Sequence, residues 1–297
     1  MPTDMPTHAP AHAHGRTLAA PVRVEGVGVF TGADTAVAFL PKAHNDRHPP
    51  GLTISRDNGP PVPATIDNLS SEPVHPLFQS MPARHTAIAT PTGTVFTVEH
   101  ALAALAGLGI TDAHIDVSGP ELPFLDGSAI GFAQPIAGAG TSELPSTTEP
   151  IAPAQPLSIV SDDARAQIDI EPPADTNPAW RYELDYAARI PSCTATWDGS
   201  PETFLETIAP ARTFSLEEEA RAMRDAGLFA RFSPADLLVM GADGSPIDNT
   251  LRTDNETAAH KLLDLIGDLA LTGAPVAATI TAYRSGHALN HRAAQAL

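Results

Sequence analysis

This 297-residue sequence has one cysteine, two lysines and few aromatic residues, which make up 5% of the chain. The single cysteine, Cys193, excludes an internal disulfide framework and a zinc site built on several cysteines. Only 17 basic residues stand against 35 acidic ones, and a formal net charge of −18 argues against the basic patches that bind nucleic acids or anionic membranes. No apolar run approaches the roughly 18 residues that span a membrane. We therefore expect a monomeric cytoplasmic protein with no nucleic-acid partner and no transmembrane segment.

The composition is that of a globular protein, with 42% hydrophobic and 18% charged residues, and the length allows two domains. Residues 1–15 are rich in Pro, Thr and His, lack the apolar core of a secretory signal, and are predicted to form a disordered tail. A Pro/Ser/Thr/Glu stretch over residues 142–156 has linker composition. We expect a first domain over 16–145, a linker over 146–156 and a second domain over 157–297.

The spacing of apolar and polar residues predicts helices and strands in both halves. Ser215 and Glu218 form the pattern of a capping box at the start of one predicted helix. Because strands and helices interleave without regular βαβ units, we expect two α+β layered domains rather than one parallel sheet. The predicted helices span residues 98–108, 215–228 and 258–273, with a short helix within 120–140. The predicted strands lie within residues 23–41, 85–96, 113–119, 157–172, 181–191, 237–244 and 274–286.

The stretch HKLLDLIGD, residues 260–268, is the most informative part of the chain. At 100° per residue, its leucines and Ile266 lie on one side of a helix. His260, Asp264 and Asp268 lie along the opposite edge, with Lys261 beside them. The polar edge is either an ordinary solvated face or half of a site.

A second helix resembles this one. EHALAALAG, residues 99–107, aligns without gaps to AHKLLDLIG, residues 259–267, and matches His100 with His260 and Gly107 with Gly267, as well as two leucines. Four matches in nine positions also arise by chance between amphipathic helices. A duplication would place a histidine at the start of the equivalent helix in each half, and pseudo-twofold packing would bring both to one cleft.

These residue types suit a metal site. His260 and Asp264 are four residues apart on a helix and can share one ion, and His100 is the candidate third ligand. A catalytic zinc takes three protein ligands and keeps one position for water or substrate. Glu99 is then the carboxylate that activates a water. The alternative interpretation is that HxxxD is a solvated pair and that Glu99 only favours a first helical turn.

His287, in SGHALNH, follows a predicted strand and is expected on a loop or at a helix start. Most histidines in such places are simply on the surface. Near Asp268, however, it would be held protonated and would suit a general acid or an oxyanion stabiliser. Lys261 adds positive charge for an anionic substrate. The whole set matches metal-assisted hydrolysis of an amide or ester.

The motifs also resemble a known family. TVEHALAALAGLGI, PELPFLDGSA, HKLLDLIGDLAL and TAYRSGHALN, in this order within residues 16–295, are similar to the UDP-3-O-acyl-N-acetylglucosamine deacetylases, zinc enzymes of lipid A synthesis. The resemblance implies two similar α+β domains, each a sheet against a helix pair, with the active site between them. It also implies an acylated nucleotide sugar as substrate and release of acetate.

The resemblance assigns His100, His260 and Asp264 as zinc ligands, although Fe²⁺ fits the same ligands. The other roles it assigns are Glu99 as general base, His287 as general acid, Asp268 as the partner that charges His287, Thr213 in ARTF as the oxyanion donor, Lys261 near the substrate diphosphate, and Phe214, Asp185 and Tyr186 as further substrate contacts.

Some positions depart from the family pattern. Phe30 stands where the family usually has histidine, and Arg231 and Phe232 replace expected glycines in a segment that borders the acyl passage. Two alternatives are open, and the departures motivate the first of them. One is a related zinc amidase for another acylated nucleotide sugar or amino sugar, and the other is a non-catalytic zinc or nucleotide-sugar sensor. Retention of Glu99 and His287 argues against the sensor, which needs neither base nor acid.

Overall fold

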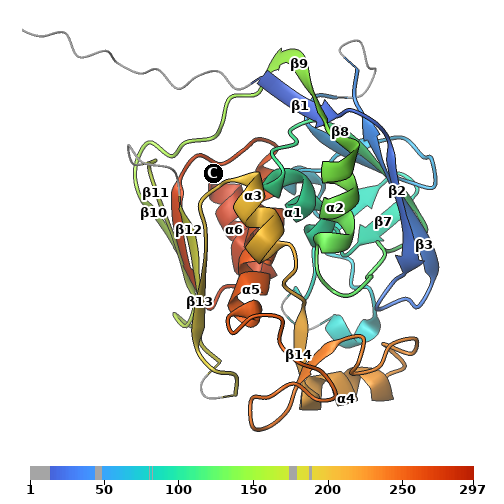
Figure 1. The fold of residues 1–297 in the computed structure, drawn as a ribbon, viewed down its shortest axis with the longest axis vertical. Coiled ribbons are helices and arrows are strands. Elements are labelled where there is room, and N and C mark those ends of the chain that lie inside the picture. The colour runs from blue at the N-terminus through green and yellow to red at the C-terminus, as the bar shows by residue number, and fades with distance from the viewer. Residues whose placement is uncertain (1–13, 44–48, 80, 82, 174–178, 187–188) are drawn as a thin grey trace, which may run out of the picture.

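The computed structural model describes residues 14–43, 49–79, 81, 83–173, 179–186 and 189–297 (Figure 1). The predicted tail therefore lies outside the described residues, except for its last two. Two five-stranded sheets form the outer layers, and a group of helices fills the space between them (Figure 1). The fold is α+β with two similar halves, as predicted.

The two sheets have the same topology. In each, the third and fourth strands in spatial order are parallel and all other neighbours are antiparallel. This shared order supports the duplication suggested by the two matching helices. The first sheet has the order β2 (Val22–Val27), β3 (Asp34–Pro41), β8 (Ala113–Ser118), β4 (Leu52–Arg56), β5 (Val62–Pro63). The second has the order β10 (Leu157–Val160), β11 (Gln167–Glu171), β16 (Thr279–Tyr283), β12 (Trp180–Leu184), β13 (Cys193–Trp197).

The central helices occupy equivalent places in the two halves, since α1 leads into β8 and α5 leads into β16. Helices α1 and α5 pack against each other at Gly267, where a Cβ would lie 2.1 Å from the carbonyl oxygen of Glu99. Only a glycine permits this approach. The main helices are α1 (Glu99–Gly107), α2 (Ile130–Ala139), α4 (Glu217–Asp225), α5 (Glu256–Leu269) and α6 (His287–Ala296), with a short α3 (Pro201–Thr203) that continues as a π-helical turn, Phe204–Ile208.

Three two-stranded sheets complete the fold. They are β1 (His14–Leu18) with β9 (Thr141–Thr147), β6 (Ala87–Thr90) with β7 (Gly93–Phe96), and β14 (Phe214–Leu216) with β15 (Leu238–Met240). Single turns of 3₁₀-helix occur at Ile66–Asn68, Pro76–Phe78 and Ala270–Thr272. Helix α5 ends through the last of these at Gly273, whose φ of 83° is the left-handed conformation that favours glycine. The sequence predicted this stop.

Two local predictions need correction. The capping box is wrong, because Ser215 lies in β14 and α4 begins at Glu217 with no side-chain cap from the preceding Leu216. Pairing of β14 with β15 outweighs the local capping pattern. In addition, the first two residues of the predicted linker, Ser146 and Thr147, belong to β9, which pairs with β1.

Burial distinguishes the two interpretations of the polar edge of residues 260–268. Its leucines and Ile266 are at most 1% exposed, as the helical pattern predicts. His260, Asp264 and Asp268 are also buried, at 2%, 2% and 0% exposed. The polar edge is therefore not a solvated face. Ionisable groups in such a place need partners.

Candidate metal centre and active site

Three of the buried polar residues form one cluster. His100 is the second residue of α1, and His260 and Asp264 are one turn apart on α5. The Nε2 atoms of His100 and His260 lie 3.6 and 3.4 Å from Asp264 Oδ1, and candidate ligand atoms of all three residues lie within 4.8 Å of one another. The ring centroids of the two histidines are 5.1 Å apart. The sequence predicted this set.

The cluster fits a metal ion. Asp264 Oδ1 is buried and has no hydrogen-bond partner, which is costly unless a cation completes it. His260 Nδ1 lies 3.2 Å from the carbonyl oxygen of Ala211 and can donate its proton there, which leaves Nε2 as the free lone pair. Burial lowers the pKa of His260 to about 3, so its imidazole is neutral. A neutral imidazole is the form that binds metals.

The carboxylate of Asp264 is ionised. Burial alone would raise its pKa, but the neighbouring His260, Lys261 and His287 side chains together outweigh burial and hold that pKa well below the ordinary value. Lys261 Nζ donates to Asp264 Oδ2 at 2.6 Å. The lysine thus pairs with the predicted ligand, and it also lines the cavity described below, at the position predicted for a substrate contact.

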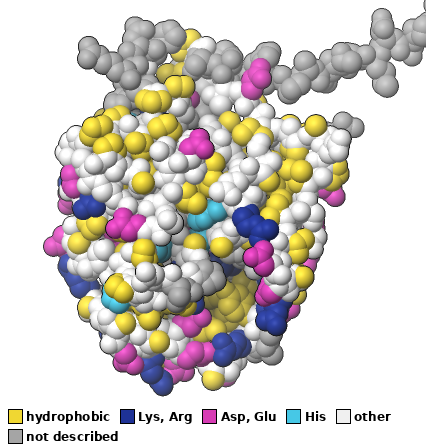
Figure 2. All heavy atoms as spheres, turned by 180° about the vertical axis from the view of Figure 1, so that it is seen from behind, with side chains coloured by type: hydrophobic (Ala, Val, Ile, Leu, Met, Phe, Trp, Pro, Cys, Tyr) yellow, Lys and Arg dark blue, Asp and Glu magenta, His cyan; other side chains and the backbone are white. Residues whose placement is uncertain are grey.

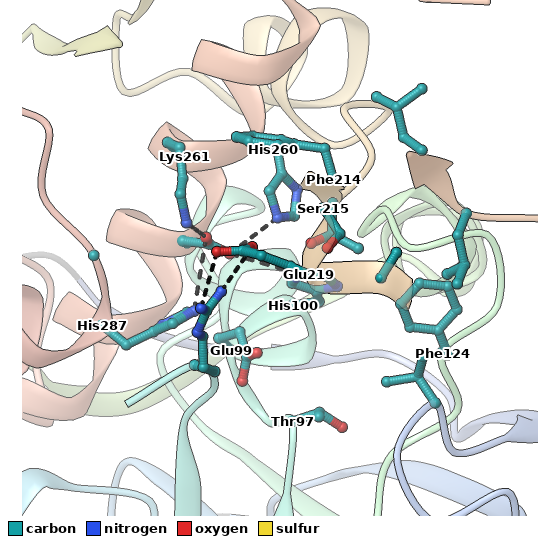
Figure 3. Close-up of a pocket in the computed structure, with 18 of the residues that line it drawn as sticks. Thr97, Glu99, His100, Phe124, Phe214, Ser215, Glu219, His260, Lys261 and His287 are labelled. Atoms are coloured by element: carbon teal, nitrogen blue, oxygen red, sulfur yellow. Dashed lines mark hydrogen bonds and ion pairs between the residues drawn. The ribbon is translucent and has the colours of Figure 1, made fainter. Parts of the chain in front are cut away.

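His287 begins α6, as predicted, and faces the cluster from the other side (Figure 3). Its Nδ1 lies 2.8 Å from Asp268 Oδ2, and its Nε2 lies 3.8 Å from Asp264 Oδ2. Burial favours the neutral ring, but the charges of Asp268 and Asp264 outweigh burial and raise the pKa of His287 to about 9. His287 is therefore a buried cation at neutral pH.

Glu99 is the first residue of α1 and is 5% exposed. One carboxylate oxygen, Oε2, accepts a hydrogen bond from the backbone N–H of Thr86 at 3.0 Å. Burial raises the pKa of Glu99, while the charges of His287 and His100 act in the opposite direction. A carboxylate with a raised pKa next to the cluster has the properties of a general base.

These groups meet in one cavity of about 440 Å³. Figure 3 shows His100, His260, Lys261 and His287 converging on one point, with Glu99 below them. In the view from behind, histidine side chains appear in the middle of the molecular surface, with arginine or lysine beside them (Figure 2). The remaining wall is largely apolar and includes Phe30, Phe124, Phe214, Leu216, Met223, Phe229 and Val239.

Most of the other predicted site residues also reach this cavity. Thr213, Phe214 and Tyr186 line it, and the Phe214 ring contacts those of Tyr186 and His260 at centroid distances of 5.6 and 6.4 Å. Asp185 is not among the lining residues. It accepts a hydrogen bond from Tyr283 and lies 3.6 Å from the guanidinium of Arg284, which does line the cavity.

The departures from the family pattern lie at the apolar end. The Phe30 ring packs against those of Phe78 and Phe229, at centroid distances of 5.3 and 5.8 Å. Arg231 donates to Asp34 at the turn after Phe30, and Phe232 packs against Phe124 at 5.2 Å. Phe30 thus forms part of the apolar wall of the cavity, whereas Arg231 and Phe232 are not among its lining residues.

Two supporting groups were not predicted from the sequence. Thr86 touches both Glu99 and Asp268. Arg212 is 8% exposed and makes a bidentate ion pair with Glu256, the first residue of α5. This pair ties the segment that carries Thr213 to the helix that carries His260. Only its position in ARTF, next to Thr213, could have drawn attention to Arg212.

The cavity holds two imidazoles and a carboxylate that fit a metal, and a second buried carboxylate and a histidinium lie beside them. This combination is typical of a metal-dependent hydrolase of amides or esters. Comparison with known proteins makes the class specific. The family model described as LpxC, UDP-3-O-acyl N-acetylglycosamine deacetylase, matches residues 15–297. The chain belongs to this family.

Individual relatives agree. A UDP-3-O-acyl-N-acetylglucosamine deacetylase of Synechocystis sp. is 35% identical over 284 residues, covering 95% of this chain and 97% of the relative. Proteins of the same name from Anaeromyxobacter sp. and Citrifermentans bemidjiense are 34% and 30% identical, each covering 93% of this chain and 85% and 86% of the relative. The predicted family and the predicted class, an N-deacetylase and hence an amide hydrolase, are confirmed. Among the described residues, no helix is long and apolar enough to cross a membrane.

Proposed function

We propose that this protein is a zinc-dependent N-deacetylase that hydrolyses the acetamide of UDP-3-O-acyl-N-acetylglucosamine. Water adds to the amide carbonyl and the C–N bond breaks, which yields acetate and UDP-3-O-acyl-glucosamine for lipid A synthesis. The observation that carries the proposal is the meeting of Glu99, His287 and the three candidate ligands at one cavity. Membership of the family supplies the substrate class.

Zinc held by His100, His260 and Asp264 would supply a Lewis acid that polarises the amide and lowers the pKa of water. The uncompensated Asp264 Oδ1 and the neutral His260 support this ligand set. Fe²⁺ suits the same ligands, so elemental analysis of protein purified without added metal tests the identity of the ion.

Glu99 acts as the general base that takes a proton from the attacking water. Its backbone hydrogen bond from Thr86 fixes one carboxylate oxygen and leaves the other for the water. His287, charged by Asp268, stabilises the oxyanion and then donates a proton to the leaving amine. Thr213 stands at the cavity wall as a further oxyanion donor.

The substrate's other parts follow from the chemistry of the walls. Lys261 and Arg284 supply positive charge for the diphosphate, with Asp185 holding the Arg284 side chain. Phe214 and Tyr186 offer aromatic faces to the sugar and the base. The acyl chain lies along the apolar wall around Phe30 and Phe229.

We also propose that the two halves of the chain are two domains, 16–147 and 157–297, joined by residues 148–156, which follow β9, and that the enzyme is a cytoplasmic monomer. The equivalent sheets support the first statement. Size-exclusion chromatography with light scattering tests the second, against the chain mass of 31.0 kDa.

The decisive experiment measures acetate release by zinc-loaded protein and by Glu99→Ala. A general base contributes about 10²- to 10⁴-fold, so we expect the variant to lose at least 100-fold in kcat at equal zinc content. Glu206→Gln, at an exposed position, is the matched control and keeps full activity. Equal rates for wild type and Glu99→Ala would disprove the mechanism. Zinc and nucleotide-sugar binding without acetate release would instead indicate a sensor.

A further inference from the structure

Thr86 lies at the contact between the two halves of the active site. It is fully buried and immediately precedes β6 in the first half. Its backbone N–H donates to Glu99 Oε2 at 3.0 Å, and its hydroxyl contacts Asp268 Oδ1 at 2.5 Å. The same hydroxyl oxygen lies 2.8 Å from Nε2 of His291, on α6. One residue thus touches the candidate base and the partner of the candidate acid.

The directions of these hydrogen bonds are determined by the available protons. Asp268 is an ionised carboxylate and only accepts, so the single hydroxyl proton of Thr86 points to Asp268. The hydroxyl oxygen of Thr86 then accepts from His291 Nε2–H. The other carboxylate oxygen of Asp268 accepts from His287 Nδ1 and from Asn290 Nδ2, both at 2.8 Å. The Asp268 carboxylate is therefore held on both sides.

We propose that Thr86 is a positioning residue for the deacetylase reaction: its N–H aims Glu99, while its hydroxyl fixes Asp268 and, through it, the ring of His287. The inference rests on the proposed function. Base and acid come from different halves of the chain, and Thr86 is the described residue that bonds to both Glu99 and Asp268. Misplacement of a catalytic group by about 1 Å can cost 100-fold in rate, so such a link matters for kcat.

The competing interpretation is that the hydroxyl only satisfies buried polar groups. Loss of a buried hydrogen bond then lowers the stability of the fold without a specific effect on kcat. Substitutions at Thr86 separate the two. Thr86→Val removes the hydroxyl and keeps the N–H that binds Glu99, and Thr86→Ser keeps both groups. The matched control is Thr53→Val, because Thr53 is equally buried and its hydroxyl contacts His114, away from the cavity.

A catalytic group misplaced by about 1 Å can lose about 100-fold in rate, and a smaller displacement loses less, so we expect Thr86→Val to lose at least 10-fold in kcat. The KM and the zinc content stay within twofold of wild type. Thr86→Ser recovers most of the rate, and Thr53→Val keeps it. An unchanged kcat in folded Thr86→Val, or an equal loss in Thr53→Val, would overturn the proposal.

A double-mutant cycle tests whether Thr86 acts through Asp268. The loss in Thr86→Val combined with Asp268→Asn should not exceed that in Asp268→Asn alone, because the hydroxyl then has no carboxylate to position. Losses that multiply would contradict the route through Asp268.

A readout without substrate separates this proposal from the proposed function. The imidazole N–H proton of His287, identified by its absence in His287→Gln, is followed by NMR in zinc-loaded protein. We expect its resonance to shift in Thr86→Val and to stay in Thr53→Val. An inactive wild type would remove the proposed function and this role with it. An active wild type with no shift and no change in kcat in Thr86→Val would remove the role of Thr86 alone.

Discussion

Gly267 on α5 lies against the carbonyl oxygen of Glu99 on α1, so closely that a Cβ would be 2.1 Å from it. Because that oxygen belongs to backbone, the contact cannot be relieved by a side-chain rotation. The close approach of the two helices brings the rings of His100 and His260 to 5.1 Å. A single missing methyl group thus sets the spacing of the metal centre.

We predict that Gly267→Ala lowers both stability and metal affinity. Overpacking costs about 1–3 kcal/mol, and here the added atom moves α5 away from α1. Urea denaturation and zinc titration measure the two effects. Gly138→Ala, in α2, is the control, because a Cβ there meets nothing within 4 Å. It should stabilise the protein by about 0.5–1 kcal/mol, as alanine does in a helix. Normal zinc affinity in Gly267→Ala would show that helix spacing does not set the site.

Chelation should abolish acetate release and lower the melting temperature, and added zinc should restore both. The free protein keeps Asp264 Oδ1 buried without a partner, so metal binding favours the folded state. At a free zinc concentration 1,000 times the Kd, the gain is about 4 kcal/mol. Calorimetry of metal-free and zinc-loaded protein measures it. Asp264→Asn, which removes the ligand charge, should show a much smaller shift on zinc addition. An equal shift in this variant would place the metal elsewhere.

The pH dependence follows from His287 and Glu99. Because the pKa of His287 is raised to about 9, the acid form persists at neutral pH, and kcat/KM should fall as the pH rises through about 9. The His287–Asp268 pair stabilises the fold fully below the ordinary histidine pKa of 6.5 and is lost as the pH passes the raised value. Burial raises the pKa of Glu99, so the acidic limb should lie above its ordinary 4.5. The measurement is a pH–rate profile, and His287→Gln should lack the alkaline limb. A variant that keeps the limb would assign it to another group.

The site could be predicted from the sequence where residues close in the chain share a helix. His260, Asp264 and Asp268 follow from helical geometry, and the repeat places His100. Long-range contacts could not be predicted in this way. Thr86 lies 182 residues from Asp268 along the chain, and β1 pairs with β9 across more than 120 residues. The false capping box at Ser215 shows the same limit, because strand pairing with β15 decides where α4 begins.

The buried ion pair of Arg212 and Glu256 should matter more than any pair on the surface. Glu256→Gln leaves a buried guanidinium without its counter-charge, which typically costs about 3–5 kcal/mol. The matched control is Glu183→Gln, since the Arg181–Glu183 pair is exposed and worth less than about 1 kcal/mol. Urea denaturation compares the two variants. Similar small losses would mean that other contacts hold the Arg212 segment.

Phe30 should determine how long an acyl chain the cavity accepts. Its ring packs against those of Phe78 and Phe229 and forms part of the apolar wall, so removing it enlarges the space available to the chain. Each additional buried methylene is worth about 0.8 kcal/mol, or roughly fourfold in kcat/KM. We therefore expect Phe30→Ala to raise the kcat/KM for long-chain relative to short-chain substrates by about fourfold for each methylene that enters the new space. The kcat/KM of wild type and variant is measured for a series of UDP-3-O-acyl-N-acetylglucosamines of increasing acyl-chain length. The control is Phe39→Leu, because Phe39 is buried in the core and does not line the cavity. An unchanged chain-length profile in Phe30→Ala would place the acyl chain along another wall.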